Sequence, residues 1–350
     1  MDSLGTLTPP AAQSRYPAAD MPARAPLAMP VQQLGAPCPK ALRHVPDAGH
    51  QPKGRSAAFL WRALVFGPAL LTTLLLIWAV ERELGDSGLT ALEYAVLALT
   101  GGNFIWISLS VSTTTAGLIS VMTARHARPA AEPAKPLSVA LLMPIYNEVP
   151  WDVLGNASAM LRDLARQPNP ERFTLFILSD TQDPAAAALE WQTYCDFRQS
   201  APAAIRVHYR RRAINTDRKV GNLTDWITGW GGGHDAMLVL DADSLMDARA
   251  ILRLADELAA DPAAGLIQTC PRLIGAQTLF ARIQQFSNMA YGTLLAHGLA
   301  RVSQTEGNYW GHNAIIRTRA FADTAGLPHL GGTSARSPGE IGRASCRERV

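Results

Sequence analysis

Two long uncharged apolar runs constrain the fold of this chain more than any other feature of its sequence. Residues 63–80 are 18 residues without a charge, and residues 94–124 are 31 residues without Asp, Glu, Lys or Arg. A helix rises about 1.5 Å per residue, so about 20 residues cross a hydrocarbon core of about 30 Å. With their flanks, the runs predict transmembrane helices over residues 57–80 and 94–124. The alternative is a pair of core helices in a soluble domain.

The charges beside the two runs predict their orientation. Basic residues precede the first run and follow the second, whereas residues 81–93 between them hold four acidic residues and one arginine. Cytoplasmic segments are enriched in Lys and Arg. We therefore expect an external, periplasmic loop over residues 81–93, with the tail and everything after residue 125 in the cytoplasm.

Composition excludes several other classes of protein. With 32 basic and 29 acidic residues the net charge is only +3, which disfavours nucleic-acid binding. The four cysteines lie far apart without a C-x-x-C pattern, which disfavours a disulfide scaffold or a zinc site. Residues 1–56 hold 10 of the 24 prolines and show no apolar periodicity. They are expected to form a disordered cytoplasmic tail.

After a linker over residues 125–136, short apolar runs alternate with amphipathic stretches. The predicted strands are Ser138–Met143, Phe173–Leu178, Ile205–His208, Met237–Leu240 and Leu266–Thr269. The predicted helices lie near Val153–Arg166, Ala185–Arg198, Gly221–Thr228 and Arg249–Ala260. Such alternation is typical of a parallel sheet covered by helices on both faces, with ligands bound beyond the carboxyl ends of its strands.

Carboxylates follow three of the predicted strands. Glu148 and Asp180 come after the first and second strands, and Asp241 and Asp243 come directly after the fourth. In the turn after a strand, the last two carboxylates can converge on one hard cation such as Mg²⁺ or Mn²⁺. The alternative is that Asp243 and Ser244 cap the next helix.

Two basic features accompany these carboxylates. Lys219 is the only lysine after Lys135, and it stands before a predicted helix beside Gly221, a residue that lets backbone approach a ligand closely. An ammonium group there suits a phosphate, although a solvated surface lysine is the alternative. The run Arg210–Arg212 is expected to be a solvated turn rather than a substrate clamp.

Taken together, these positions resemble glycosyl transferase family 2, and within it the glucans biosynthesis glucosyltransferase H family. The resemblance covers about residues 52–330. It rests on the ordered motifs at residues 143–148 (MPIYNE), 178–180 (LSD), 219–222 (KVGN), 241–244 (DADS), 268–269 (QT) and 307–314 (GNYWGHNA), with the long segment 280–301.

The resemblance implies a GT-A nucleotide-sugar-binding domain over residues 137–330, with a parallel-rich sheet between helices, behind two transmembrane helices. It also implies an inverting, multi-pass enzyme of the bacterial inner membrane. Such an enzyme uses UDP-glucose to build the β-glucan backbone of osmoregulated periplasmic glucans. The implied partners are a growing glucan acceptor, the lipid bilayer and a periplasmic protein that processes the glucan.

The resemblance also assigns roles to individual residues. Tyr146, Glu148 and Asp180 would contact the uridine, and Lys219 the nucleotide. Asp241 would lie near the ribose and the metal, Mg²⁺ or Mn²⁺, which Asp243 would bind directly.

The catalytic base is where this sequence departs from the family. There, an acidic residue beyond the Gly-His-Asn segment deprotonates the acceptor. Here the resemblance stops near Leu330, so the domain is expected to be incomplete at its C-terminus, with residues 331–350 as a non-native tail. Asp323, the only later aspartate, falls in a predicted helix and is a poor substitute. We therefore expect an inactive truncation. The alternatives are a single-sugar transferase acting on a polyprenyl phosphate, and a non-catalytic membrane module that senses nucleotide sugars.

Overall fold

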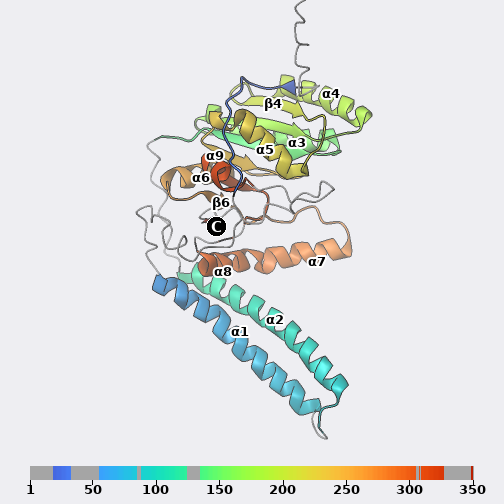
Figure 1. Ribbon diagram of the computed structural model, residues 1–350, viewed down its shortest axis with the longest axis vertical. Helices are drawn as coiled ribbons and strands as arrows, with labels where there is room; N and C mark the ends of the chain where they lie inside the picture. The colour runs from blue at the N-terminus through green and yellow to red at the C-terminus, as the bar shows by residue number, and fades with distance from the viewer. Residues whose placement is uncertain are drawn as a thin grey trace, which may run out of the picture. The chain divides into compact units, whose positions relative to one another are not determined.

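The computed structural model shown in Figure 1 describes residues 19–32, 55–84, 88–123, 135–304, 307, 309–326 and 348–349. The chain divides into two compact units. The sheet unit comprises residues 1–35, 132–261 and 309–344, and the helical unit comprises residues 36–131, 262–308 and 345–350.

The sheet unit is built on six strands in the order β1-β4-β3-β2-β5-β7. These are β1 (Ala19–Asp20), β2 (Val139–Ile145), β3 (Phe173–Ser179), β4 (Arg206–Arg211), β5 (Ala236–Val239) and β7 (Ala314–Arg317). The four central strands are parallel, while β1 and β7 run antiparallel to their neighbours β4 and β5. Every residue of β3 and β5 is buried, as expected for strands covered on both faces.

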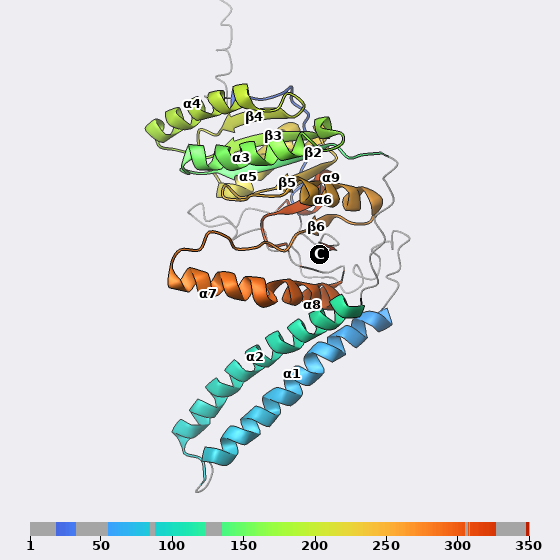
Figure 2. The same cartoon turned by 180° about the vertical axis from the view of Figure 1, so that it is seen from behind.

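Helices cover both faces of this sheet. They are α3 (Pro150–Leu164), α4 (Pro184–Ser200), α5 (Arg218–Trp230), α6 (Ala248–Ala260) and α9 (Thr318–Thr324), with short 3₁₀ turns at Pro170–Arg172 and Gly231–Gly233. Figures 1 and 2 show α3, α4 and α6 on one face and α5 and α9 on the other. The α/β fold class is therefore confirmed, with a parallel-rich sheet between helices. All five predicted strands are present within two or three residues of their expected bounds, whereas β1 and β7 were not predicted.

Residues 19–32 depart from the expectation of an unfolded tail. Asp20 pairs with Tyr209 of β4, and its carboxylate accepts a hydrogen bond of 2.7 Å from the Tyr194 hydroxyl. Farther along, the Leu27 N–H donates to the Ile227 carbonyl, and the Trp230 indole N–H donates to the Pro22 carbonyl. These backbone and side-chain bonds to the folded sheet unit fix a segment that has little apolar surface of its own to bury.

The helical unit contains the two long apolar helices, α1 (Arg55–Leu84) and α2 (Ala91–Thr123). Both are long and apolar enough to cross a membrane, over Ala58–Leu84 and Ala91–Thr123. Only 17% and 33% of the most apolar window of each helix is buried within the protein. Large apolar side chains such as Leu71, Leu99 and Trp106 are more than half exposed. This exposure is the opposite of what a soluble core helix shows, and it supports membrane association.

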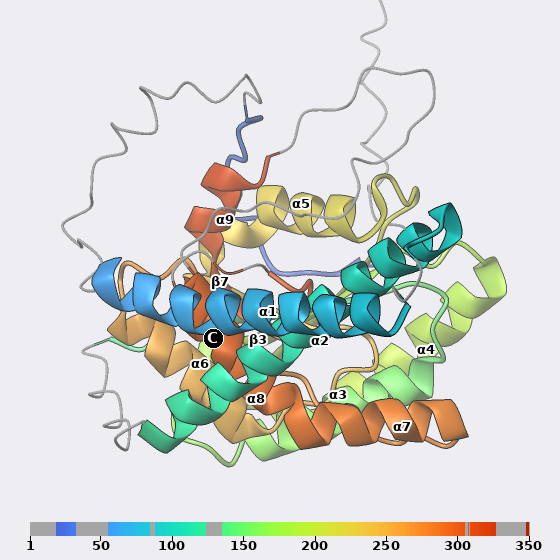
Figure 3. The same cartoon turned by 90° about the horizontal axis from the view of Figure 1, so that it is seen from below.

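The rest of the helical unit comes from residues 262–308, which were expected to belong to the nucleotide-sugar-binding domain, and from residues 345–350. It includes α7 (Leu279–Ser287), a π-helical turn (Asn288–Gly292) and α8 (Thr293–Ser303). Strand β6 (Leu266–Gln268) pairs in parallel with β8 (Glu348–Arg349). Figure 3 gives the view of these helices from below.

Several predictions concern segments outside the described residues. They include residues 1–18 and 33–54 of the expected tail, most of the linker 125–136, and residues 331–347 and 350 of the expected non-native tail.

Candidate nucleotide-sugar site

One cleft of about 620 Å³ opens at the carboxyl ends of β2, β3 and β5 in the sheet unit. All six predicted site residues line it: Tyr146, Glu148, Asp180, Lys219, Asp241 and Asp243. Asn215 and Arg218, from the loop before α5 and its first turn, complete the polar part of the wall. Because these residues follow the carboxyl ends of neighbouring parallel strands, the fold brings together residues that are almost 100 positions apart in sequence.

The turn that follows β5 carries Asp241 and Asp243, and its backbone is fixed at Asp241. The Ser244 hydroxyl accepts a hydrogen bond of 3.0 Å from the Asp241 N–H and donates to the Asn313 side-chain oxygen, also at 3.0 Å. Helix α6 begins only at Ala248, and its N-cap is Asp247, whose carboxylate accepts from the Arg249 N–H. The alternative that Asp243 caps this helix is therefore wrong, because the helix starts four residues later than that alternative requires.

Lys219 lies in the first turn of α5 and reaches across to the Asp241 turn. Its ammonium group donates to Asp241 Oδ1 and, at 3.0 Å, to the carbonyl of Gly311. Gly221 was expected to let a ligand approach, but a Cβ there would lie 2.0 Å from the carbonyl oxygen of Thr216. The glycine is required by the chain's own backbone, since Asp217 and Arg218 turn sharply with φ of 55° and 50°.

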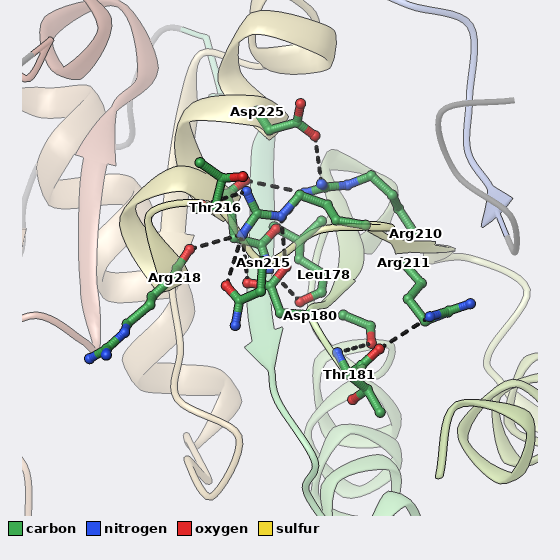
Figure 4. Close-up of polar contacts among 12 residues, drawn as sticks. Leu178, Asp180, Thr181, Arg210, Arg211, Asn215, Thr216, Arg218 and Asp225 are labelled. Atoms are coloured by element: carbon green, nitrogen blue, oxygen red, sulfur yellow. Dashed lines mark hydrogen bonds and ion pairs between the residues drawn. The ribbon is translucent and has the colours of Figure 1, made fainter. Parts of the chain in front are cut away.

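Asp180 is buried and paired with Arg212. The guanidinium makes a two-pronged contact with the carboxylate, at 2.6 Å from Nε and 2.8 Å from Nη2. The same guanidinium donates to the carbonyls of Thr216 and Arg218 at 3.0 Å each. Arg212 thus ties the end of β3 to the loop that carries Lys219, and Figure 4 shows the surrounding contacts.

The expectation that Arg210–Arg212 form a solvated turn is wrong. Strand β4 continues to Arg211, and the Arg210 side chain is fully buried. Arg210 donates to Asp225 at 2.6 Å and to the Asn222 side-chain oxygen at 2.5 Å, and Asn222 in turn donates to the Leu178 carbonyl. Buried carboxylate and amide groups on α5 make burial of this charge possible. Arg212 directly follows β4 as Asp180 directly follows β3, so the same attention to residues after strands could also have found Arg212.

A buried polar chain supports the loop that carries Tyr146 and Glu148. The Asn147 N–H donates to the Thr181 hydroxyl at 3.0 Å, and that hydroxyl donates to Glu190 at 2.8 Å. The other oxygen of Glu190 accepts from the Tyr209 hydroxyl at 2.6 Å. Asn147 itself has a φ of 55°, in the left-handed region. Glu190 was not predicted, because a glutamate on an amphipathic helix carries no signal of burial in the sequence.

Two buried polar atoms near Asp241 have no hydrogen-bond partner within the part of the chain that the structure describes. They are the Tyr309 hydroxyl and His312 Nδ1, and the latter lies 3.9 Å from Asp241 Oδ2. Burial raises the pKa of Tyr309, with a further contribution from the negative charge of Asp241. A buried polar atom without a partner is costly, but neither Tyr309 nor His312 is among the residues that line the cleft.

The donor set of the cleft fits a hard divalent cation. Among the described residues no group of three or more His, Cys, Asp and Glu side chains is arranged to hold a metal by itself. Magnesium, however, is usually bound by one or two carboxylates together with substrate phosphates and water. Asp241 and Asp243 would supply the carboxylates, and substrate phosphates and water would supply the remaining ligands.

Asp323 does not join this cleft. It lies on α9, where its carboxylate pairs with Arg319 one helical turn earlier, at 3.6 Å. The prediction that this aspartate falls in a helix is confirmed.

Comparison with known proteins agrees with the motif resemblance. Residues 140–324 match the family model described as glycosyl transferase family 2. The chain is 43% identical over 309 residues to the glucans biosynthesis glucosyltransferase H of Vibrio cholerae, which covers 87% of this chain and 43% of the relative. The protein of the same name from Shewanella baltica is also 43% identical and covers 87% of this chain and 42% of the relative. The chain thus spans less than half the length of these curated relatives.

Among solved structures, the chain is similar to a mannosyltransferase from Pyrobaculum calidifontis in complex with GDP-Man and Mn²⁺. The identity is 16%, the TM-score is 0.39, and the match covers 84% of this chain and 65% of the other. This likeness is too distant to place any residue.

Proposed function

Because the chain belongs to glycosyl transferase family 2, we propose that its cleft binds UDP-glucose together with Mg²⁺ or Mn²⁺. In this proposal the cleft is the donor site of a membrane-embedded, inverting glucosyltransferase that builds a β-glucan. The observation that carries the proposal is the convergence of Tyr146, Glu148, Asp180, Lys219, Asp241 and Asp243 on one cleft. The similarity to the glucosyltransferase H proteins supports glucose as the sugar and the backbone of osmoregulated periplasmic glucans as the product.

In this proposal, different side chains of the cleft bind different parts of the nucleotide. Tyr146, which is half exposed, offers a ring face to the uracil base, and Glu148 and Asp180 accept hydrogen bonds from the uridine. Arg212 fixes the orientation of Asp180 by its two-pronged contact. Lys219 is free to move from Asp241 to the diphosphate, because an ammonium on a flexible stem binds phosphate as a point charge.

Asp241 and Asp243 are the residues that would hold the cation. A divalent ion bound to these carboxylates would stabilise the negative charge on the leaving diphosphate. The chain's own contribution is a turn in which Ser244, itself bonded to Asn313, fixes the backbone at Asp241, so that the backbone carrying the carboxylates is already ordered when the donor arrives and Lys219 leaves Asp241.

Acceptor activation is a separate requirement. An inverting transfer needs a base that removes the proton from the acceptor hydroxyl. The carboxylates that line the cleft in the described part of the chain, Glu148, Asp180, Asp241 and Asp243, all have donor-side roles in this proposal. We therefore propose that the chain binds the donor but does not form glucan.

Turnover tests this division between binding and transfer. General-base assistance typically contributes about 10²–10⁴-fold to rate, and loss of acceptor positioning adds to the deficit. Membranes that contain only this chain should bind radiolabelled UDP-glucose and release no polymer above background. A labelled polymer that disappears in Asp241→Asn would show instead that a base lies within the chain, and a labelled glycolipid would favour single-sugar transfer.

The proposed location is the inner membrane, with the sheet unit in the cytoplasm. Reporter fusions after Gly49, Ser87 and Pro136 should report inside, outside and inside, because the basic flanks of α1 and α2 favour the cytoplasm. An external signal at Pro136 would contradict both the orientation and the use of a cytoplasmic nucleotide sugar. Equal internal signals at all three sites would show that α1 and α2 do not cross.

A further inference from the structure

The loop between β2 and α3 carries Tyr146 and Glu148, which the proposed function assigns to the uridine, and a single hydrogen bond holds it. Within the part of the chain that the structure describes, the Asn147 N–H bond to the Thr181 hydroxyl is the only hydrogen bond made by residues 146–148. All three residues are exposed, and Asn147 has a φ of 55°, which asparagine tolerates but does not prefer. The position of the loop therefore depends on Thr181.

Thr181 itself is firmly placed. Its backbone N–H donates to the Ser179 hydroxyl at 3.2 Å, and its carbonyl accepts from Arg211 Nη1 at 3.2 Å, a contact drawn in Figure 4. Its side chain is fully buried. The freedom that remains to this residue is the direction in which its hydroxyl points its proton.

Glu190 on α4 sets that direction. It is only 2% exposed, and its Oε2 accepts the Thr181 hydroxyl proton at 2.8 Å. A hydroxyl has one proton to donate and two lone pairs that accept. Because the proton of Thr181 is given to Glu190, the lone pairs are left for the Asn147 N–H. The carboxylate, which only accepts, thus fixes the polarity of the whole chain of bonds.

The second oxygen of Glu190 is held from the other side. Its Oε1 accepts from the Tyr209 hydroxyl at 2.6 Å. Burial raises the pKa of Tyr209, and the negative charge of Glu190 raises it further, so the hydroxyl remains a donor. The Tyr209 ring lies against Trp191 and Tyr194, with centroids 5.2 Å and 5.0 Å away. With both oxygens engaged in charge-assisted bonds, the carboxylate is held in one orientation.

Packing beneath the loop is incomplete. A cavity of about 10 Å³ is lined by Glu148 together with Glu190, Tyr194 and Tyr209. This volume is at the lower limit of what one water molecule needs. Since side chains leave this space unfilled, the bond from Asn147 to Thr181 has the larger part in placing the loop.

We infer that Thr181 and Glu190 are positioning residues for recognition of the uracil base, although neither lines the cleft. Glu190 orients the Thr181 hydroxyl, and that hydroxyl holds the Asn147 N–H. Tyr146 and Glu148, on either side of Asn147, are thereby kept where both can contact the base. The inference rests on the proposed binding of UDP in this cleft. It places the preference for uracil partly in buried groups behind the wall of the cleft.

Thr181→Val in the full chain tests this role, because valine keeps the size of the side chain and removes the hydroxyl. Affinity is measured in detergent for UDP and for ADP, each with Mg²⁺. ADP has the same ribose and diphosphate but a purine in place of uracil. We expect UDP to bind about 3–10-fold more weakly, about what one hydrogen bond contributes, with ADP affinity unchanged. Glu190→Gln should act in the same direction, because it has one acceptor oxygen in place of two.

Two matched variants serve as controls. Thr181→Ser keeps the hydroxyl and should retain the preference for UDP over ADP. Thr174→Val removes another buried hydroxyl, on β3, for which the described part of the chain offers no hydrogen-bond partner. It should leave both affinities unchanged.

The outcomes separate this inference from the proposed function. An unaltered preference for UDP in Thr181→Val, when the unchanged chain prefers UDP to ADP, would overturn this inference alone. Equal weakening of UDP and ADP would also overturn it, because the whole cleft rather than the base contact would then be affected. Equal affinity of the unchanged chain for UDP and ADP would overturn the proposed uridine contacts, and this inference with them.

Discussion

Asp243→Asn is expected to remove the dependence of UDP binding on Mg²⁺ or Mn²⁺. The substitution keeps the size of the side chain but removes the charge that a hard cation requires of its ligand. Binding in the presence of the cation should weaken about 10–100-fold, the usual consequence of perturbing a metal site. Binding in chelator should stay close to that of the unchanged chain.

The matched control for this variant is Asp247→Asn. It removes the same charge four residues away, at the N-cap of α6 and outside the lining of the cleft. It should leave the effect of the cation on UDP affinity unchanged, although it loses a helix cap. Titration calorimetry of both variants in detergent measures the difference. Unaltered, cation-dependent affinity in Asp243→Asn would mean that Asp243 is not a metal ligand.

Arg210→Ala is expected to cause the largest loss of stability in the sheet unit. Removal of one member of a buried ion pair leaves the other charge uncompensated and costs about 3–5 kcal/mol. Asp225, whose side chain is 5% exposed, would lose the guanidinium that lies 2.6 Å from its Oδ2. Because about 1 kcal/mol shifts the midpoint by roughly 2–4 °C in a domain of this size, the thermal midpoint should fall by roughly 6–20 °C.

The double variant Arg210→Met/Asp225→Leu separates charge burial from loss of packing. It removes both charges and keeps apolar volume, so it should recover most of the lost midpoint. The exposed pair Arg319 and Asp323 provides the control. Arg319→Ala should lower the free energy of unfolding by no more than about 1 kcal/mol, which corresponds to a midpoint shift of roughly 2–4 °C. Thermal unfolding followed by tryptophan fluorescence measures all three. A midpoint of Arg210→Ala within 2 °C of the unchanged chain, by this same scale, would contradict the structural role of the pair.

The sequence predicted the central strands well because their signal is local. β2 and β5 are continuous apolar runs, and β3 is apolar apart from Thr174 and its last residue, Ser179, which is the pattern typical of a buried parallel strand. The same pattern located Asp180, Asp241 and Asp243 at one edge of the sheet. β7 was not predicted, since its four residues gain their partner only through antiparallel pairing with β5, which is distant in sequence.

The remaining differences have the same origin. Arg210 and Arg212 looked solvated because their partners Asp225 and Asp180 lie 15 and 32 residues away. Residues 19–32 looked unstructured because what holds them is the surface of α5 and the edge of β4 rather than their own side chains. Gly221 looked like a contact for a ligand, whereas the backbone that approaches it belongs to Thr216. Contacts between distant parts of the chain decided each of these cases.

Competition for radiolabelled UDP-glucose on the full chain tests the central claim, that the cleft binds a nucleoside diphosphate sugar through a divalent cation. The competitors are UDP and UMP, each measured with Mg²⁺ and with chelator. The account predicts that UDP displaces the label at about 10–100-fold lower concentration than UMP when Mg²⁺ is present, because the second phosphate completes the cation site held by Asp241 and Asp243. In chelator that advantage should disappear. Equal displacement by UDP and UMP in Mg²⁺, or no specific binding of the label, would contradict it.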